Sequence, residues 1–108
     1  MATSPEYITF VCDSLHGFGI VTKKHMFGEY IVYLNGKPIL LVCDNTPFVK
    51  TLPETASLLG DAPRGYPYEG AKEHFLLDIE DAELLQQLIP VLEQITPLPK
   101  PRKNKKGN

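Results

Sequence analysis

Histidine and cysteine are the side chains of this 108-residue chain with the widest range of chemistry, and there are three of one and two of the other. They are His16, His25, His74, Cys12 and Cys43. Cys12 and His16 stand one helical turn apart, a spacing at which an imidazole could activate a thiol as a nucleophile. Cys12 also lies on an apolar stripe, which favours a packing role. The five residues match no metal-binding spacing, so no metal or other cofactor is expected.

Carboxylates are the next candidates, because a pair of them can perform acid–base catalysis. The candidates are Glu29, Asp44, Asp78, Glu80 and Asp81. The chain carries 13 acidic residues in all, and no pair is singled out by its surroundings, so a solvated surface explains them. The glycines form no phosphate-binding loop. We therefore expect a protein that is not an enzyme and has no catalytic residue.

The charge is divided unevenly along the chain. Residues 1–99 hold 6 basic and 13 acidic residues, a formal charge of −7, and residues 100–108 hold five basic residues and no acid. Those five are Lys100, Arg102, Lys103, Lys105 and Lys106. The proline- and lysine-rich segment 98–108 is expected to be disordered and to contact nucleic acid weakly, without sequence preference. A transcriptional regulator that uses this tail on DNA is the alternative function.

The remaining chain predicts one domain over residues 1–97. A serine cap and a proline start a helix at residue 4, and an aspartate caps a last helix at residue 81 that contains Pro90. Strands are expected at 20–27, on both sides of Asn35-Gly36, at 46–50 and at 75–79, and a short helix at 51–60. The fold class is α+β, with a mainly antiparallel sheet of about five strands and helices packed on one face. The expected order is helix, three strands, short strand, helix, strand, helix.

The hairpin around Asn35-Gly36 predicts an interaction surface. A two-residue turn fixes the register, so that Val32 should lie opposite Ile39. One face then carries Tyr30, Val32, Leu34, Ile39 and Leu41, and the other carries Ile31, Tyr33, Leu40 and Val42. Neither face is polar, and helices on one side can cover only one of them. The second face is therefore expected to form an interface, in a homodimer or with an unknown protein partner.

Two further expectations concern ligands and location. Tyr66 and Tyr68 flank a proline in the loop 61–73 and could form the mouth of a small-molecule site, which is a third and more remote function. No apolar run is long enough to span a bilayer and no secretory signal precedes the domain, so no membrane association and a cytoplasmic location are expected.

The segment "KKHMFGEYIVYLNGKPILLV" resembles the signature of the TfoX N-terminal domain family. The matching motif residues are Met26, Phe27, Gly28, Tyr30, Tyr33, Asn35 and Gly36, after the basic pair Lys23 and Lys24. Similarity extends over about residues 4–96, although Glu29 stands where the family has a second glycine. The resemblance implies a stand-alone, non-enzymatic, regulatory α+β domain. TfoX competence regulators carry a second domain where this chain has its basic tail, and the resemblance transfers no catalytic residue.

Overall fold

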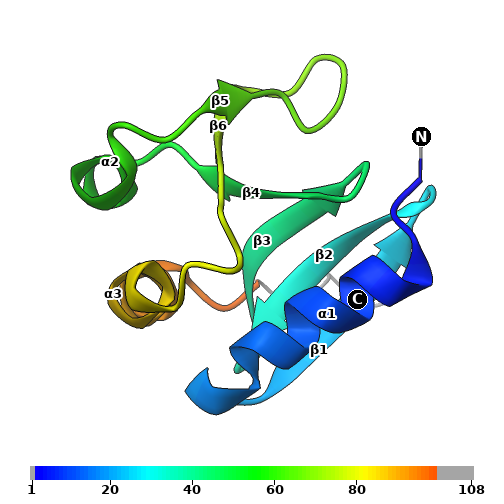
Figure 1. Ribbon diagram of the computed structural model, residues 1–108, viewed down its shortest axis with the longest axis horizontal. Coiled ribbons are helices and arrows are strands. Elements are labelled where there is room, and N and C mark those ends of the chain that lie inside the picture. The colour runs from blue at the N-terminus through cyan, green and yellow to red at the C-terminus, as the bar shows by residue number, and fades with distance from the viewer. Residues whose placement is uncertain (1, 100–108) are drawn as a thin grey trace, which may run out of the picture.

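A six-stranded antiparallel sheet and three α-helices make up residues 2–99, which are the residues that the computed structural model describes (Figure 1). The elements are α1 (Pro5–Leu15), a 3₁₀ turn (His16–Phe18), β1 (Val21–Met26), β2 (Glu29–Leu34), β3 (Lys37–Cys43), β4 (Thr46–Lys50), α2 (Pro53–Leu59), β5 (Arg64–Gly65), β6 (His74–Leu76) and α3 (Ala82–Ile95). The strand order is β1-β2-β3-β4-β6-β5. The predicted α+β class is confirmed, with the two-residue β5 as a strand that the sequence pattern did not predict.

The first four strands form a meander through three two-residue turns. These turns are Phe27-Gly28, Asn35-Gly36 and Asp44-Asn45, and φ lies between 52° and 83° at all six residues. Positive φ at both central residues defines the type I′ turn, whose twist matches that of the flanking strands. The hairpin at Asn35-Gly36 was predicted. A bend was expected at Gly28, but Phe27 was assigned to the preceding strand and not to the turn; the Asp44-Asn45 turn was not predicted.

The register between β2 and β3 differs from the predicted one. Leu34 lies opposite Lys37 and Tyr33 opposite Pro38, as expected, but Val32 then pairs with Leu40 and not with Ile39. Ile39 is therefore an extra residue in β3, a β-bulge. Because side chains alternate between faces with a period of two residues, the extra residue exchanges the two faces for the rest of β3.

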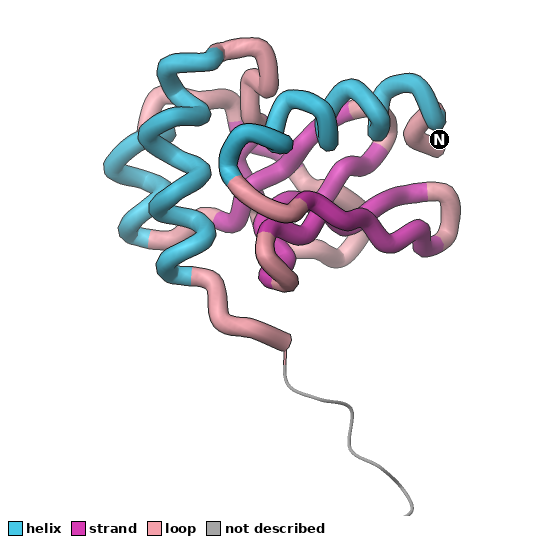
Figure 2. Tube along the Cα trace, turned by 90° about the horizontal axis from the view of Figure 1, so that it is seen from below, coloured by secondary structure: helices cyan, strands magenta, loops and turns pink. Residues whose placement is uncertain are grey.

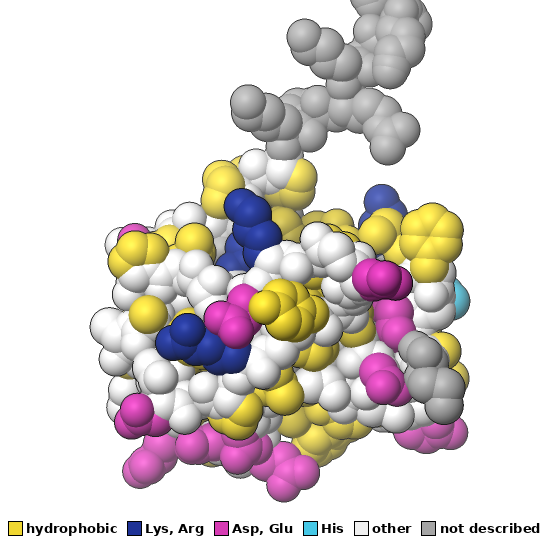
Figure 3. Space-filling view, turned by 90° about the horizontal axis from the view of Figure 1, so that it is seen from above, with side chains coloured by type: hydrophobic (Ala, Val, Ile, Leu, Met, Phe, Trp, Pro, Cys, Tyr) yellow, Lys and Arg dark blue, Asp and Glu magenta, His cyan; other side chains and the backbone are white. Residues whose placement is uncertain are grey.

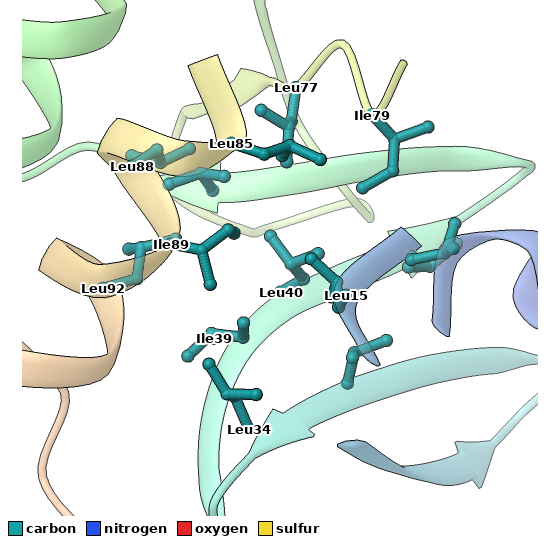
Figure 4. Close-up of a cluster of buried hydrophobic side chains, with 14 of the residues drawn as sticks. Leu15, Leu34, Ile39, Leu40, Leu77, Ile79, Leu85, Leu88, Ile89 and Leu92 are labelled. Atoms are coloured by element: carbon teal, nitrogen blue, oxygen red, sulfur yellow. The ribbon is translucent and has the colours of Figure 1, made fainter. Parts of the chain in front are cut away.

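Helix α1 lies across one face of the sheet, the inner face, whereas α2 and α3 lie side by side at one end of the strands, with the buried side of α3 against the same core (Figure 2). This inner face presents buried side chains from β2, β3, β4 and β6: Val32, Leu34, Leu40, Val42, Val49 and Phe75. Helices α1 and α3 contribute Ile8, Val11, Leu15, Leu85, Leu88, Ile89 and Leu92 to the same cluster (Figure 4). The prediction that helices cover one face of the sheet is thus confirmed.

The helix starts are those predicted. The Ser4 hydroxyl accepts a hydrogen bond from the Tyr7 N–H at 3.1 Å, and an Asp81 carboxylate oxygen accepts one from Leu84 at 3.1 Å. Pro90 lies inside α3. The strand expected at 75–79 is shorter, because only His74–Leu76 pairs with neighbours, although Leu77 still points into the core.

We expect the Asn35-Gly36 turn to be sensitive to substitution. Gly36→Ala places an L-residue at φ 83° and brings a Cβ within 3.3 Å of Leu98, so it should lower the free energy of unfolding by about 1–2 kcal/mol. Gly17→Ala is the control, since a Cβ there meets nothing within 4 Å. Urea unfolding measures both. Equal stability of the two variants would contradict the turn geometry.

Candidate functional site

The face of the sheet opposite the helices, here called the outer face, has no helix over it among the described residues. Strand pairing places Ile31 opposite Leu41, Leu41 opposite Phe48, and Phe48 opposite Leu76 on this face. Tyr33 and His74 share the same side. The outer face is therefore apolar across β2, β3, β4 and β6, as a sheet covered on both sides would be.

A groove of about 430 Å³ runs over the outer face, and we call it the outer groove. Its floor includes Ile31, Leu41 and Phe48. Its wall is formed by the end of α3 and the following segment: Leu92, Ile95, Thr96, Pro97, Leu98 and Pro99. Lys50 and His74 are its only residues with ionisable side chains among those described. The outer groove is thus a binding surface dominated by apolar side chains.

The interface predicted from the hairpin is only partly located on this face. Ile31 and Tyr33 lie on the outer face, but of these two only Ile31 lines the groove. Leu40 and Val42 are 2% and 0% exposed and face the core, although Leu40 is also among the groove-lining residues. The bulge at Ile39 is the physical reason, because it turns Leu40 and Val42 inward and Leu41 outward. The sequence reasoning missed Leu41, Phe48 and Leu98. The four consecutive aliphatic residues 39–42, which do not alternate with polar residues, are the signal that could have indicated a bulge.

His74 lines the outer groove and makes contacts with the backbone and with an aromatic ring. It is only 8% exposed. Its Nδ1 lies 2.8 Å from the carbonyl oxygen of Lys72, so Nδ1 carries the proton that is donated there. Its ring also meets Phe48 edge-on at a centroid distance of 6.4 Å. His74 therefore shapes one end of the groove.

The thiols are unsuited to nucleophilic catalysis at neutral pH. Burial raises the pKa of Cys12, and burial followed by the charge of Glu29 raises the pKa of Cys43 to about 11. A thiol must ionise to act as a nucleophile or metal ligand. Within residues 2–99, no three His, Cys, Asp or Glu side chains lie together as a metal site would require.

Three of the candidate carboxylates accept hydrogen bonds, mostly from backbone N–H groups. Glu29 Oε1 accepts hydrogen bonds from the Thr3 hydroxyl at 2.7 Å and from the Asp44 N–H at 3.0 Å. Asp78 Oδ1 accepts from the Glu80 N–H at 3.1 Å, and Asp81 caps α3. These bonds stabilise turns and a helix end, and they account for three of the five candidates without catalysis.

The residues of the family motif are mostly structural. Gly28, Asn35 and Gly36 occupy type I′ turns, and the Asn35 side-chain oxygen accepts a hydrogen bond from the Ile20 N–H at 2.9 Å. Tyr30 stacks on His25 at a centroid distance of 4.7 Å and packs against the core.

Met26 and Phe27 differ from the rest of the motif because they are exposed. Phe27 is 101% exposed at the tip of the β1–β2 hairpin, with φ 53°. A fully exposed aromatic residue in a strained conformation is typical of a functional position.

Two predicted regions lie away from the outer groove or outside the described residues. Tyr66 and Tyr68 are exposed and do not line the groove, so they form no mouth for it. Lys100, Arg102, Lys103, Lys105 and Lys106 lie outside the described residues. The chain leads into them directly from Pro99, which lines the groove.

The fold and the site define an α+β domain with a one-sided core and an apolar groove on the opposite sheet face. No family model matches the chain. It is 36% identical over 107 residues to the "Uncharacterized 12.7 kDa protein in trpE 5'region" of Spirochaeta aurantia, across 97% of this chain and 93% of that protein. The chain belongs to the same family as that spirochaete protein. Among residues 2–99, no helix has the length and apolar character needed to cross a membrane.

We expect both thiols to react slowly with iodoacetamide. At pH 7.5 Cys43 should be alkylated more than about a hundredfold more slowly than a free thiol, because so little thiolate is present. Its raised pKa means that the folded state holds the proton more tightly than the unfolded state. Stability should therefore fall as the pH rises from about 9 to about 11. Rapid labelling of native protein at neutral pH would contradict this.

Proposed function

We propose that the protein is a non-enzymatic, regulatory interaction domain, similar to the TfoX N-terminal domain, that binds another polypeptide through its outer face. The outer groove is the single observation that carries the proposal. Its apolar floor spans three strands and includes the partly buried Ile31 and Leu41, and its wall includes Leu98, which is 62% exposed. When a partner covers apolar surface of this kind, the free energy of the system falls, which favours binding.

A homodimer is one form of this proposal. Two outer faces meeting about a twofold axis would each cover the apolar side chains of the other. Lys24, which pairs with Ile31 in the sheet, and Lys50 lie on the outer face of each copy, so both partners would present lysines at such an interface. Like charges at an interface oppose association, so self-association through this face is expected to be weak.

Comparative capture from a cell extract tests the outer face. The test variant is Leu98→Asp in the outer groove, and the matched control is Ile20→Asp, which is 72% exposed and outside the groove. Both changes add one carboxylate at an exposed aliphatic residue. We expect proteins captured by the wild type and by Ile20→Asp to be absent with Leu98→Asp. Identical capture by all three proteins would count against the proposal.

Sedimentation equilibrium tests the homodimer. We expect the apparent mass to rise with salt at high protein concentration, since the Debye length falls from about 10 Å at 0.1 M to about 3 Å at 1 M and the lysine repulsion is screened. Ile31→Asp on the outer face should remove the effect. A monomer at every salt concentration would exclude the dimer while leaving binding of another polypeptide in place.

A further inference from the structure

Among the described residues three polar side chains are buried, and His74 is the one that leaves a polar atom without a partner. The hydroxyls of Thr3 and Thr55 each donate a hydrogen bond and accept another. His74 is 8% exposed and bonds only through Nδ1, since Nε2 forms no hydrogen bond to a described residue. A buried polar atom without a partner costs stability, so Nε2 calls for a ligand that completes its bond.

The tautomer of His74 makes Nε2 a hydrogen-bond acceptor. Nδ1 lies 2.8 Å from the Lys72 carbonyl oxygen, which can only accept, so Nδ1 carries the proton of the neutral ring and Nε2 carries a lone pair. The two nitrogens lie on opposite sides of the imidazole, and the lone pair of Nε2 therefore points away from Lys72. Because His74 lines the outer groove, a molecule seated in the groove can supply the missing N–H or O–H donor.

The surroundings of His74 favour a flat, apolar ring as the part of the ligand that carries this donor. Phe48 meets the imidazole edge-on, and the pyrrolidine rings of Pro38, Pro97 and Pro99 also line the groove. The groove volume of about 430 Å³ lies within the range of ligand-binding sites, roughly 300–1,000 Å³. Tyrosine and tryptophan side chains combine a large apolar ring with one polar group that finds a hydrogen-bond partner when it is buried.

A positively charged donor is disfavoured at this position. Lys50 lies directly opposite His74 in the β4–β6 pairing and also lines the groove, so an incoming ammonium or guanidinium group would meet a like charge. No carboxylate side chain of a described residue lines the groove to offset that repulsion. In Figure 3 the described chain ends at the upper edge among hydrophobic side chains, and acidic side chains lie mostly along the lower and right-hand edges. The donor should therefore be neutral.

On the basis of the proposed function, we infer that the outer groove holds a tyrosine or tryptophan side chain of the partner polypeptide, whose hydroxyl or indole N–H donates to Nε2 of His74. The ring lies on the apolar floor, and its burial supplies most of the binding free energy. Serine, threonine, asparagine and glutamine offer a donor with little apolar surface. Phenylalanine or leucine would cover Nε2 without giving it a bond. His74 thus determines which anchor residue the groove accepts.

Solution NMR of the full-length protein with side-chain analogues tests the inference. The probes are p-cresol, the analogue of the tyrosine side chain, and toluene, which is the same ring without the hydroxyl. p-Cresol should bind at least about threefold more tightly, as expected for one additional neutral hydrogen bond. In mildly alkaline buffer, the nitrogen-15 resonance of His74 Nε2 should move with p-cresol and not with toluene. Equal affinities, or an Nε2 resonance that does not respond, would overturn the inference.

Two substitutions of His74 distinguish recognition from a purely structural role. His74→Asn retains an N–H near the position of Nδ1 for the Lys72 carbonyl but has no acceptor at the position of Nε2, so the preference for p-cresol should disappear. His74→Gln places an amide oxygen near the position of Nε2 and should restore the preference. His25→Asn is the matched control, because His25 lies on β1 and does not line the groove. A preference that survives His74→Asn, or that His25→Asn also removes, would contradict the role of His74.

The outcomes separate this inference from the proposed function. If p-cresol and toluene bind alike while Leu98→Asp still loses its captured proteins, His74 selects no anchor and the groove remains a polypeptide site. If p-cresol is preferred while all three proteins of the capture experiment behave identically, the proposed function fails, and the polypeptide origin of the ring fails with it. A second copy also carries exposed tyrosines, Tyr66 and Tyr68. Self-association that is lost in the double variant Tyr66→Phe, Tyr68→Phe would assign the ring to that copy and overturn a separate partner.

Discussion

The extra residue in β3 determines which side chains the sheet offers to each of its two faces. Ile39 has no partner on β2, and the strand resumes its alternation one residue later, with Leu40 opposite Val32. Leu40 and Val42 then reach the helices, and Leu41 lies beside Phe48 on the outer face. Without the bulge, Leu41 would point toward the helices and Val42 away from them. The one-sided core and the outer groove both depend on this single irregularity.

A second set of contacts ties the N-terminus to two turns of the meander. The Thr3 N–H donates to the Gly28 carbonyl oxygen at 3.1 Å, and its hydroxyl donates to Glu29 and accepts from the Asn45 N–H at 3.2 Å. The Asn45 side-chain oxygen in turn accepts from the Ser4 N–H at 2.9 Å. This partly buried network satisfies polar groups that would otherwise lose hydrogen bonds on folding, and it fixes the start of α1 over the sheet.

Local signals in the sequence were sufficient to predict most of the fold, but they predicted less of the candidate site. Caps at Ser4 and Asp81 and the turn at Asn35-Gly36 act within a few residues, so their patterns predicted the elements correctly. The bulge depends on how the helices pack against β3, a tertiary constraint that periodicity alone does not carry.

The wall of the outer groove was missed for a related reason. Residues 96–99 are rich in proline and look like the beginning of a tail, yet Leu98 approaches the Asn35-Gly36 turn. Only the path of the chain after α3 brings that leucine to the sheet.

The Thr3 network also bears on the order in which the chain can fold during synthesis. The first four strands are joined by two-residue turns, and pairing between sequence neighbours is fast because little chain entropy is lost in closing each loop. Thr3, in contrast, needs Asn45, whose backbone is 42 positions further along. The N-terminal segment leaves the ribosome first but cannot complete its contacts until the β3–β4 turn has emerged. Helix α1 can therefore dock completely only after the sheet on which it packs has formed.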